Sequence, residues 1–118
     1  MDTVLIVEDE QGIRETLQEV LEFAGYAVLV ASNGKEGYDI IINEQPDLVL
    51  CDVNMPKLGG FELLEAVNQR LKESSIPPFL FLTAKVEMEE MRYGMSLGAD
   101  DYIFKPFSVN EVLKTVQL

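Results

Sequence analysis

The chain has 118 residues, 47% hydrophobic and 25% charged, which is the composition of one globular domain large enough to bury a core. It carries 9 basic and 21 acidic residues, and its net charge of −12 predicts repulsion from nucleic acid and from anionic membranes. Because it contains no histidine, it lacks the commonest general base, and any phosphohistidine in its chemistry must belong to another molecule.

Nothing in the sequence predicts export or membrane insertion. The first residues, MDTVLIVEDE, lack the basic segment of a signal peptide, and no apolar run approaches the length of a membrane span. The single cysteine, Cys51, excludes an internal disulfide and fits a reducing compartment. We therefore expect a cytoplasmic protein that binds neither membranes nor nucleic acid directly.

Five short apolar segments are predicted to form β-strands: Thr3–Val7, Tyr26–Ala31, Asp47–Cys51, Pro78–Thr83 and Asp101–Phe104. Most are apolar throughout rather than alternating, which is typical of strands whose two faces are both covered.

The intervening segments carry apolar residues at helical spacing. These residues are Ile13, Leu17, Val20, Leu21 and Ala24 in the first segment, Phe61, Leu64, Val67 and Leu71 in the third, Met88, Met91 and Met95 in the fourth, and Val109, Val112, Leu113 and Val116 in the last. Asn33 and Ser108 are each followed three residues later by a glutamate, which predicts N-caps, whereas Gly25 and Gly98 predict helix ends. We expect the methionine stripe to be part of the core rather than a partner surface.

Strands that alternate with helices predict one doubly wound α/β domain over residues 1–118, with a parallel sheet and helices on both faces. The last helical pattern is still in phase at Leu118. That pattern suits the N-terminal module of a longer protein as well as a free-standing domain.

Polar residues gather where the predicted strands end. Glu8 and Asp9 follow the first strand, Asp52 the third, Thr83 ends the fourth, and Lys105 follows the fifth. Helices connect parallel strands, so all of these residues are expected at the carboxyl edge of one sheet, where open α/β folds bind ligands.

Taken singly, each residue has a structural explanation. Asp9 can cap a helix, Asp52 can belong to the turn that follows it, Thr83 suits a strand, and Lys105-Pro106 suits a loop. These explanations would have to coincide at the same end of four strands, so the joint pattern favours a functional site.

The grouped charges predict a metal-assisted phosphoryl acceptor. The carboxylates of Glu8, Asp9 and Asp52 repel one another unless they are neutralised, and a hard divalent cation such as Mg²⁺, or Mn²⁺ in its place, would do this together with Lys105. Asp52 is then a carboxylate able to attack phosphorus, and the Thr83 hydroxyl can donate to a phosphoryl oxygen.

Four segments carry a resemblance to a known family. They are VEDE at Val7–Glu10, DVNMPKLGG at Asp52–Gly60, FLTA at Phe81–Ala84 and GADDYIFKPF at Gly98–Phe107. In this order and spacing the sequence resembles, over nearly its whole length, the CheY-like receiver domain of bacterial response regulators in two-component systems. The resemblance implies a flavodoxin-like (βα)5 fold with strand order 2-1-3-4-5.

The resemblance also implies roles for the site residues. Asp52 would be the phosphoacceptor; Asp9, Asp52 and the carbonyl of Asn54 would bind Mg²⁺, and Glu8 would act through water. Lys105 would bind the phosphoryl group, aimed by a cis peptide bond to Pro106.

A switch is implied as well. Thr83 would be the switch hydroxyl and Tyr102 the switch aromatic, although Tyr102 would otherwise be read as a half-buried strand residue. A histidine kinase or phosphotransfer protein would supply the phosphoryl group, and the face of the fourth helix, fifth strand and fifth helix would then control partner binding or homodimerisation. We further hypothesise that Asn54 and Lys85 flank the route of the hydrolytic water and tune the phosphoryl lifetime.

Two other functions remain open from the sequence. A Mg²⁺-dependent aspartyl-phosphate phosphatase also combines an aspartate nucleophile with Thr, Lys and further acids, but it has a proton-shuttling aspartate where this chain has Asn54. A non-phosphorylated interaction module of the same fold usually lacks one of the site residues. Away from the site, Cys51 is expected to point into the core and Asp100 and Asp101 to form a solvated loop.

Overall fold

The computed structural model describes residues 2–84 and 88–117. In this part of the chain strands and helices alternate as β1 (Thr3–Val7), α1 (Gln11–Phe23), β2 (Ala27–Ala31), α2 (Gly34–Glu44), β3 (Leu48–Asp52), α3 (Gly60–Arg70), β4 (Phe79–Thr83), α4 (Met88–Leu97), β5 (Asp101–Phe104) and α5 (Val109–Val116). A short 3-10 helix, Glu73–Ser75, precedes β4. No helix in these two ranges combines the length and apolar character that crossing a membrane requires.

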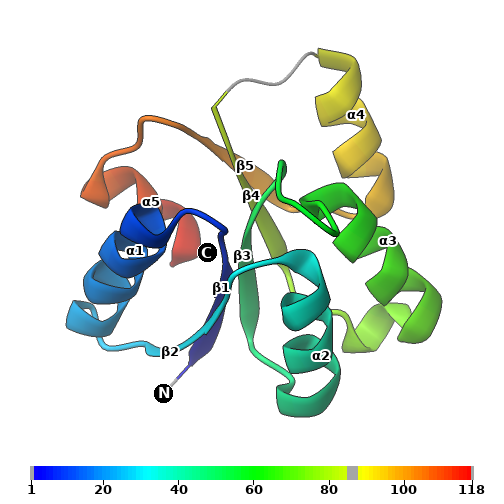
Figure 1. The fold of residues 1–118 in the computed structure, drawn as a ribbon, viewed down its shortest axis with the longest axis horizontal. Coiled ribbons are helices and arrows are strands. Elements are labelled where there is room, and N and C mark those ends of the chain that lie inside the picture. The colour runs from blue at the N-terminus through cyan, green and yellow to red at the C-terminus, as the bar shows by residue number, and fades with distance from the viewer. Residues whose placement is uncertain (1, 85–87, 118) are drawn as a thin grey trace.

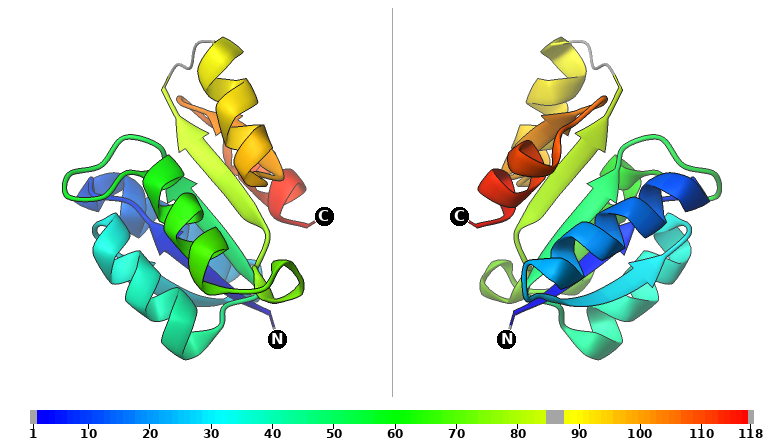
Figure 2. Two further views of the ribbon diagram at one scale, coloured as in Figure 1. Left: turned by 90° about the vertical axis from the view of Figure 1, so that its right-hand side faces the viewer. Right: turned by 90° about the vertical axis from the view of Figure 1, so that its left-hand side faces the viewer.

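The five strands form one parallel sheet in the order β2-β1-β3-β4-β5, which confirms the predicted flavodoxin-like fold. Helices α1 and α5 cover one face of the sheet, and α2, α3 and α4 lie on the other (Figure 1). Figure 2 shows α4 beside β4 and β5, at the opposite end of the sheet from α2.

Most residues of the strands are apolar because the two faces of the sheet contribute to two separate hydrophobic cores. Alternate residues point to opposite faces of a strand. Thus Leu50 packs with the α1 and α5 residues, whereas its neighbours Val49 and Cys51 pack with those of α2 and α3. Cys51 is fully buried, so its prediction as a small core residue is confirmed.

The predicted capping residues lie at the ends of helices. The Asn33 side chain accepts a hydrogen bond from the Glu36 amide at 2.9 Å, and Ser108 and Glu111 form a reciprocal capping box. Gly25 and Gly98 have φ angles of 100° and 106°, a backbone conformation that glycine adopts without steric cost. The β2, β3 and β4 strands each begin one residue later than predicted, and β3 includes Asp52.

The prediction that the methionine stripe belongs to the core is wrong. Met88 and Met95 are 67% and 50% exposed, and only Met91 packs against the core as a half-buried side chain. The residues of α4 that face the core are instead Met91, Gly94 and Leu97, and Gly94 is buried. The pattern misled because glycine carries no hydropathy signal at the position where α4 approaches the sheet most closely.

Asp100 has a more definite role than a solvated loop. Its side chain accepts a hydrogen bond from the Phe79 amide at 2.9 Å, and its own amide donates to the Phe79 carbonyl at 2.8 Å. Asp101 is exposed and begins β5. Asp100 therefore ties the start of β5 to the start of β4.

Candidate functional site

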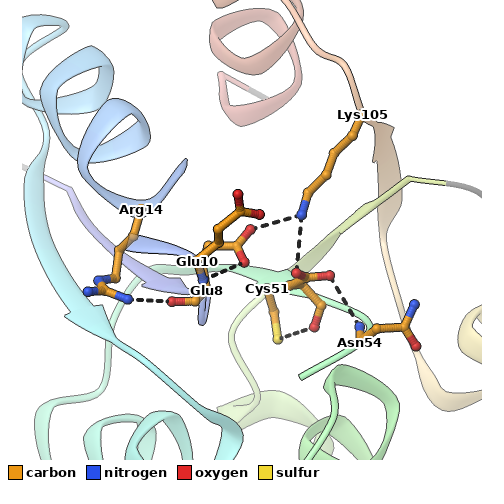
Figure 3. A network of polar contacts seen from close by, with 7 residues as sticks. Glu8, Glu10, Arg14, Cys51, Asn54 and Lys105 are labelled. Atoms are coloured by element: carbon orange, nitrogen blue, oxygen red, sulfur yellow. Dashed lines mark hydrogen bonds and ion pairs between the residues drawn. The ribbon is translucent and has the colours of Figure 1, made fainter. Parts of the chain in front are cut away.

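Lys105 joins two acids at the carboxyl edge of the sheet. Its Nζ lies 3.0 Å from Glu8 Oε1 and 3.1 Å from Asp52 Oδ2 (Figure 3). Glu8 directly follows β1, Asp52 is the last residue of β3, and Lys105 directly follows β5. Parallel strands that end at one edge thus bring together residues up to 97 positions apart in the sequence.

Asp9 completes a cluster of carboxylates. Glu8, Asp9 and Asp52 each offer one oxygen, and these oxygens lie within 4.8 Å of one another. Glu8 is fully buried and Asp52 is 6% exposed, whereas Asp9 is exposed. Oxygen donors of this kind, open to water on one side, fit a hard divalent cation that keeps part of its hydration shell.

The electrostatics of the site are set by burial. Burial, together with hydrogen bonding and negative charge from Asp52, raises the pKa of Glu8 from 4.5 to about 7. Lys105 and the Glu10 amide oppose this rise. Burial by itself would lower the pKa of Lys105, but the hydrogen bonds and charges of Glu8 and Asp52 outweigh it, so the pKa is raised and the amine stays protonated.

Backbone donors and an arginine fix the two acids in place. Asp52 Oδ1 accepts a hydrogen bond from the Asn54 amide at 3.2 Å, and Glu8 Oε2 accepts one from the Glu10 amide at 3.2 Å. Arg14 in α1 donates to the Glu8 carbonyl at 2.9 Å and so braces the turn after β1 (Figure 3). The sequence analysis missed Arg14 because a half-buried arginine one position after an apolar helix residue resembles an ordinary surface residue.

The loop that follows Asp52 folds back tightly on its own strand. The Gly60 amide donates to the Val53 carbonyl at 2.8 Å, and a side chain at Gly60 would overlap the Asp52 carbonyl. The Asn54 side chain is exposed beside the acids. The Gly-Gly turn therefore allows α3 to begin directly under the site.

The remaining predicted residues are Thr83, Pro106, Tyr102 and Lys85. Thr83 ends β4, is 1% exposed, and its carbonyl accepts a hydrogen bond from the Lys105 amide at 2.7 Å. The peptide bond between Lys105 and Pro106 is cis. Tyr102 is the second residue of β5, three positions before Lys105, and at 9% exposed it is more deeply buried than a half-buried strand residue. Lys85 lies outside the described residues.

A comparison with protein families identifies the domain. A family model described as the response regulator receiver domain matches residues 4–117. The chain belongs to this family. Receiver domains of response regulators act in two-component signalling, in general with a histidine kinase as partner, and they generally bind Mg²⁺.

Curated relatives agree with this assignment. The receiver domain is 41% identical to the response regulator MprA of Mycolicibacterium vanbaalenii over 110 residues, which are 93% of this chain and 46% of that protein. It is also 41% identical to the transcriptional regulatory protein DltR of Streptococcus agalactiae over 115 residues, 98% of this chain and 50% of that protein. The chain spans about half the length of the curated relatives it matches.

Solved receiver structures match nearly end to end. The chemotaxis protein CheY4 of Vibrio cholerae superimposes with a TM-score of 0.91 at 35% identity, covering 99% of this chain and 97% of that one. The non-phosphorylated HemR receiver domain of Leptospira biflexa gives a TM-score of 0.88 at 37% identity, with 99% and 92% covered.

The raised pKa of Glu8 gives the receiver a pH-dependent stability in the absence of metal. Because the folded state favours protonated Glu8, this contribution is fully present below about pH 4.5 and is lost as the pH rises to about 7. In EDTA, the free energy of unfolding of the native protein relative to Glu8→Gln should fall by on the order of 2–3 kcal/mol across this window, measured by urea denaturation. The exposed Glu19→Gln is the control and should show a flat difference; a difference for Glu8→Gln that grows with pH contradicts the assignment.

Proposed function

We propose that Asp52 accepts a phosphoryl group from the phosphohistidine of a partner protein in a Mg²⁺-dependent reaction. The observation that carries this proposal is the buried Asp52 carboxylate held between Lys105 and two further acids at an edge open to water. An oxygen of Asp52 would attack phosphorus while the phosphorus–nitrogen bond of the phosphohistidine breaks, and the imidazole would leave with the electron pair of that bond.

Divalent cation binding is part of this proposal. Asp9, Asp52 and the carbonyl of Asn54 would bind Mg²⁺, for which Mn²⁺ could substitute, and the ion would offset the charge of the incoming phosphoryl group. Glu8 would act through water, since its oxygens already accept hydrogen bonds from Lys105 and the Glu10 amide.

Lys105 would change partners during the reaction. Before transfer its Nζ forms ion pairs with Glu8 and Asp52 at 3.0 and 3.1 Å. After transfer the acceptor carries roughly two more negative charges, and the same amine would contact the phosphoryl oxygens. Thr83, at the end of the neighbouring strand, would donate its hydroxyl to another of these oxygens.

The new charge would act as a switch. Movement of Thr83 toward the phosphoryl group would vacate space at the end of β4, and Tyr102 would follow into it. The face formed by α4, β5 and α5 would then change shape and bind an output partner or a second copy of the chain. Exposed Met95, Phe104 and Val109 give this face apolar contact area.

The receiver would work as a signalling domain that catalyses only its own phosphorylation and dephosphorylation. Asn54, two residues after Asp52, cannot shuttle protons as the aspartate of a phosphatase does. Turnover of aryl phosphates by the native protein would favour the phosphatase, whereas retention of a single phosphoryl group favours the receiver function.

Intact-mass analysis tests the acceptor. Treatment with acetyl phosphate and Mg²⁺ should add the mass of one phosphoryl group to the native protein and to Asp39→Asn, an exposed acid on α2. Asp52→Asn, and native protein in EDTA, should gain nothing. Equal phosphorylation of Asp52→Asn would refute the assignment, and a native protein that gains no mass would favour the non-phosphorylated interaction module.

Thermal unfolding tests the metal. Because Mg²⁺ would bind only the folded state, it should raise the melting temperature, with about 2.7 kcal/mol of stabilisation at 100 times its dissociation constant. Asp52→Asn should reduce this response because it removes a ligand, whereas Asp39→Asn should keep it. An absent Mg²⁺ response in the native protein counts against the metal site.

Residue 54 gives a test of the phosphoryl lifetime. Its side chain is exposed two residues after Asp52, where we propose that the hydrolytic water passes, so Asn54→Ala should slow hydrolysis by up to about tenfold, equivalent to about 1.4 kcal/mol of activation free energy. Loss of phosphorylated protein after removal of acetyl phosphate measures the rate, with Asn110→Ala in α5 as control. If both Asn54→Ala and Lys85→Ala leave the rate unchanged, the two residues do not tune it.

A further inference from the structure

Gly94 is the point at which α4 meets the aromatic residues of the sheet. A side chain at this position would overlap the Tyr102 hydroxyl, and its Cβ would lie 2.7 Å from Phe61 Cε1 and 3.2 Å from Tyr102 Cζ. Glycine is a poor residue for a helix interior, yet it is the buried residue of α4. The position of Tyr102 explains why a glycine is needed there.

Tyr102 lies across the turn of α4 that contains Gly94. Its hydroxyl donates to the Met91 carbonyl at 3.2 Å, one turn before Gly94. Its ring centroid is 5.7 Å from that of Phe81 and 6.4 Å from that of Phe104. The Tyr102 hydroxyl occupies the space that a Cβ at position 94 would fill. We call this space, together with the Met91 carbonyl, the tyrosine seat.

Phe61, the other neighbour of Gly94, is firmly held. Its ring makes edge contacts with Phe81 and Tyr93, at centroid distances of 5.1 and 5.6 Å. The Tyr93 hydroxyl in turn donates to Glu65 at 2.9 Å, which fixes Tyr93 against α3. A methyl group at position 94 is therefore relieved by movement of Tyr102 or of α4, and either movement changes the α4–β5 face.

We propose that Gly94 is a positioning residue whose missing side chain keeps Tyr102 in its seat under α4 and so sets the resting state of the switch. The regulatory part of this proposal rests on the proposed function, in which Tyr102 leaves its present position when Asp52 is phosphorylated. A side chain at position 94 removes the seat, raises the population of the phosphorylated-like arrangement without phosphorylation, and tightens binding of a phosphoryl mimic.

The seat is tested by NMR on protein carrying ¹³Cε-labelled tyrosine, with the Tyr102 signal assigned from Tyr102→Phe. In Gly94→Ala this signal should move toward the position that it takes in native protein treated with beryllofluoride and Mg²⁺. Gly12→Ala is the matched control, because Gly12 is also helical but a Cβ there has nothing within 4 Å, and it should leave the signal in place. An unmoved Tyr102 signal in Gly94→Ala refutes the seat.

The link to the switch is tested by beryllofluoride affinity in the presence of Mg²⁺. The apparent dissociation constant should fall about fivefold or more in Gly94→Ala and stay unchanged in Gly12→Ala. A moved Tyr102 signal with unchanged affinity refutes the link. Native protein that binds no beryllofluoride refutes the proposed function instead, and the Tyr102 signals of the two alanine variants then decide the seat alone.

Stability provides a second measurement that does not depend on a folded Gly94→Ala protein. Gly94→Ala should lower the melting temperature less in the Tyr102→Ala background than in the native chain, since the overlapping hydroxyl and ring are gone while the close contact with Phe61 remains. An equal loss of melting temperature in the two backgrounds refutes the seat. If Gly94→Ala does not fold, restored folding in the double variant supports the seat, whereas a double variant that also fails to fold assigns the need for glycine to Phe61 and refutes the seat.

Discussion

The site depends on the two ion pairs that the ammonium group of Lys105 forms with Glu8 and Asp52. Glu8 is fully buried and Asp52 nearly so, and a buried carboxylate is costly without a partner. Lys105 supplies one positive charge to both, yet Asp9 adds a third acid nearby. The receiver therefore keeps an excess of negative charge at an edge open to water. This imbalance is the physical reason to expect that the cluster would bind a hard divalent cation.

Much of this could be predicted from the sequence, because the connectivity of the fold decides it. Continuously apolar segments separated by helical patterns require a parallel sheet covered on both faces, and parallel strands necessarily end at one edge. Once Asp52 and Lys105 were assigned to strand ends, their meeting followed without any knowledge of side-chain contacts.

What could not be predicted depends on close packing. Hydropathy placed Met95 in the core, whereas the inward position of α4 belongs to Gly94. Asp100 looked like a loop residue because its hydrogen bond to Phe79 joins segments that are distant in the sequence. Arg14 braces Glu8 through a backbone carbonyl, an acceptor that every residue has. Such contacts depend on distances of a few ångströms between elements, and no sequence pattern encodes them.

The pairing of Glu8 with Lys105 joins the first strand of the chain to the last. During synthesis on the ribosome the amine that completes the cluster emerges only after all five strands, so an incomplete chain has the acids but not their counter-charge. A nascent or truncated receiver would thus hold Glu8 and Asp52 without the ammonium group that pairs with both in the folded domain. The charge balance of the cluster is in this way tied to completion of the sheet.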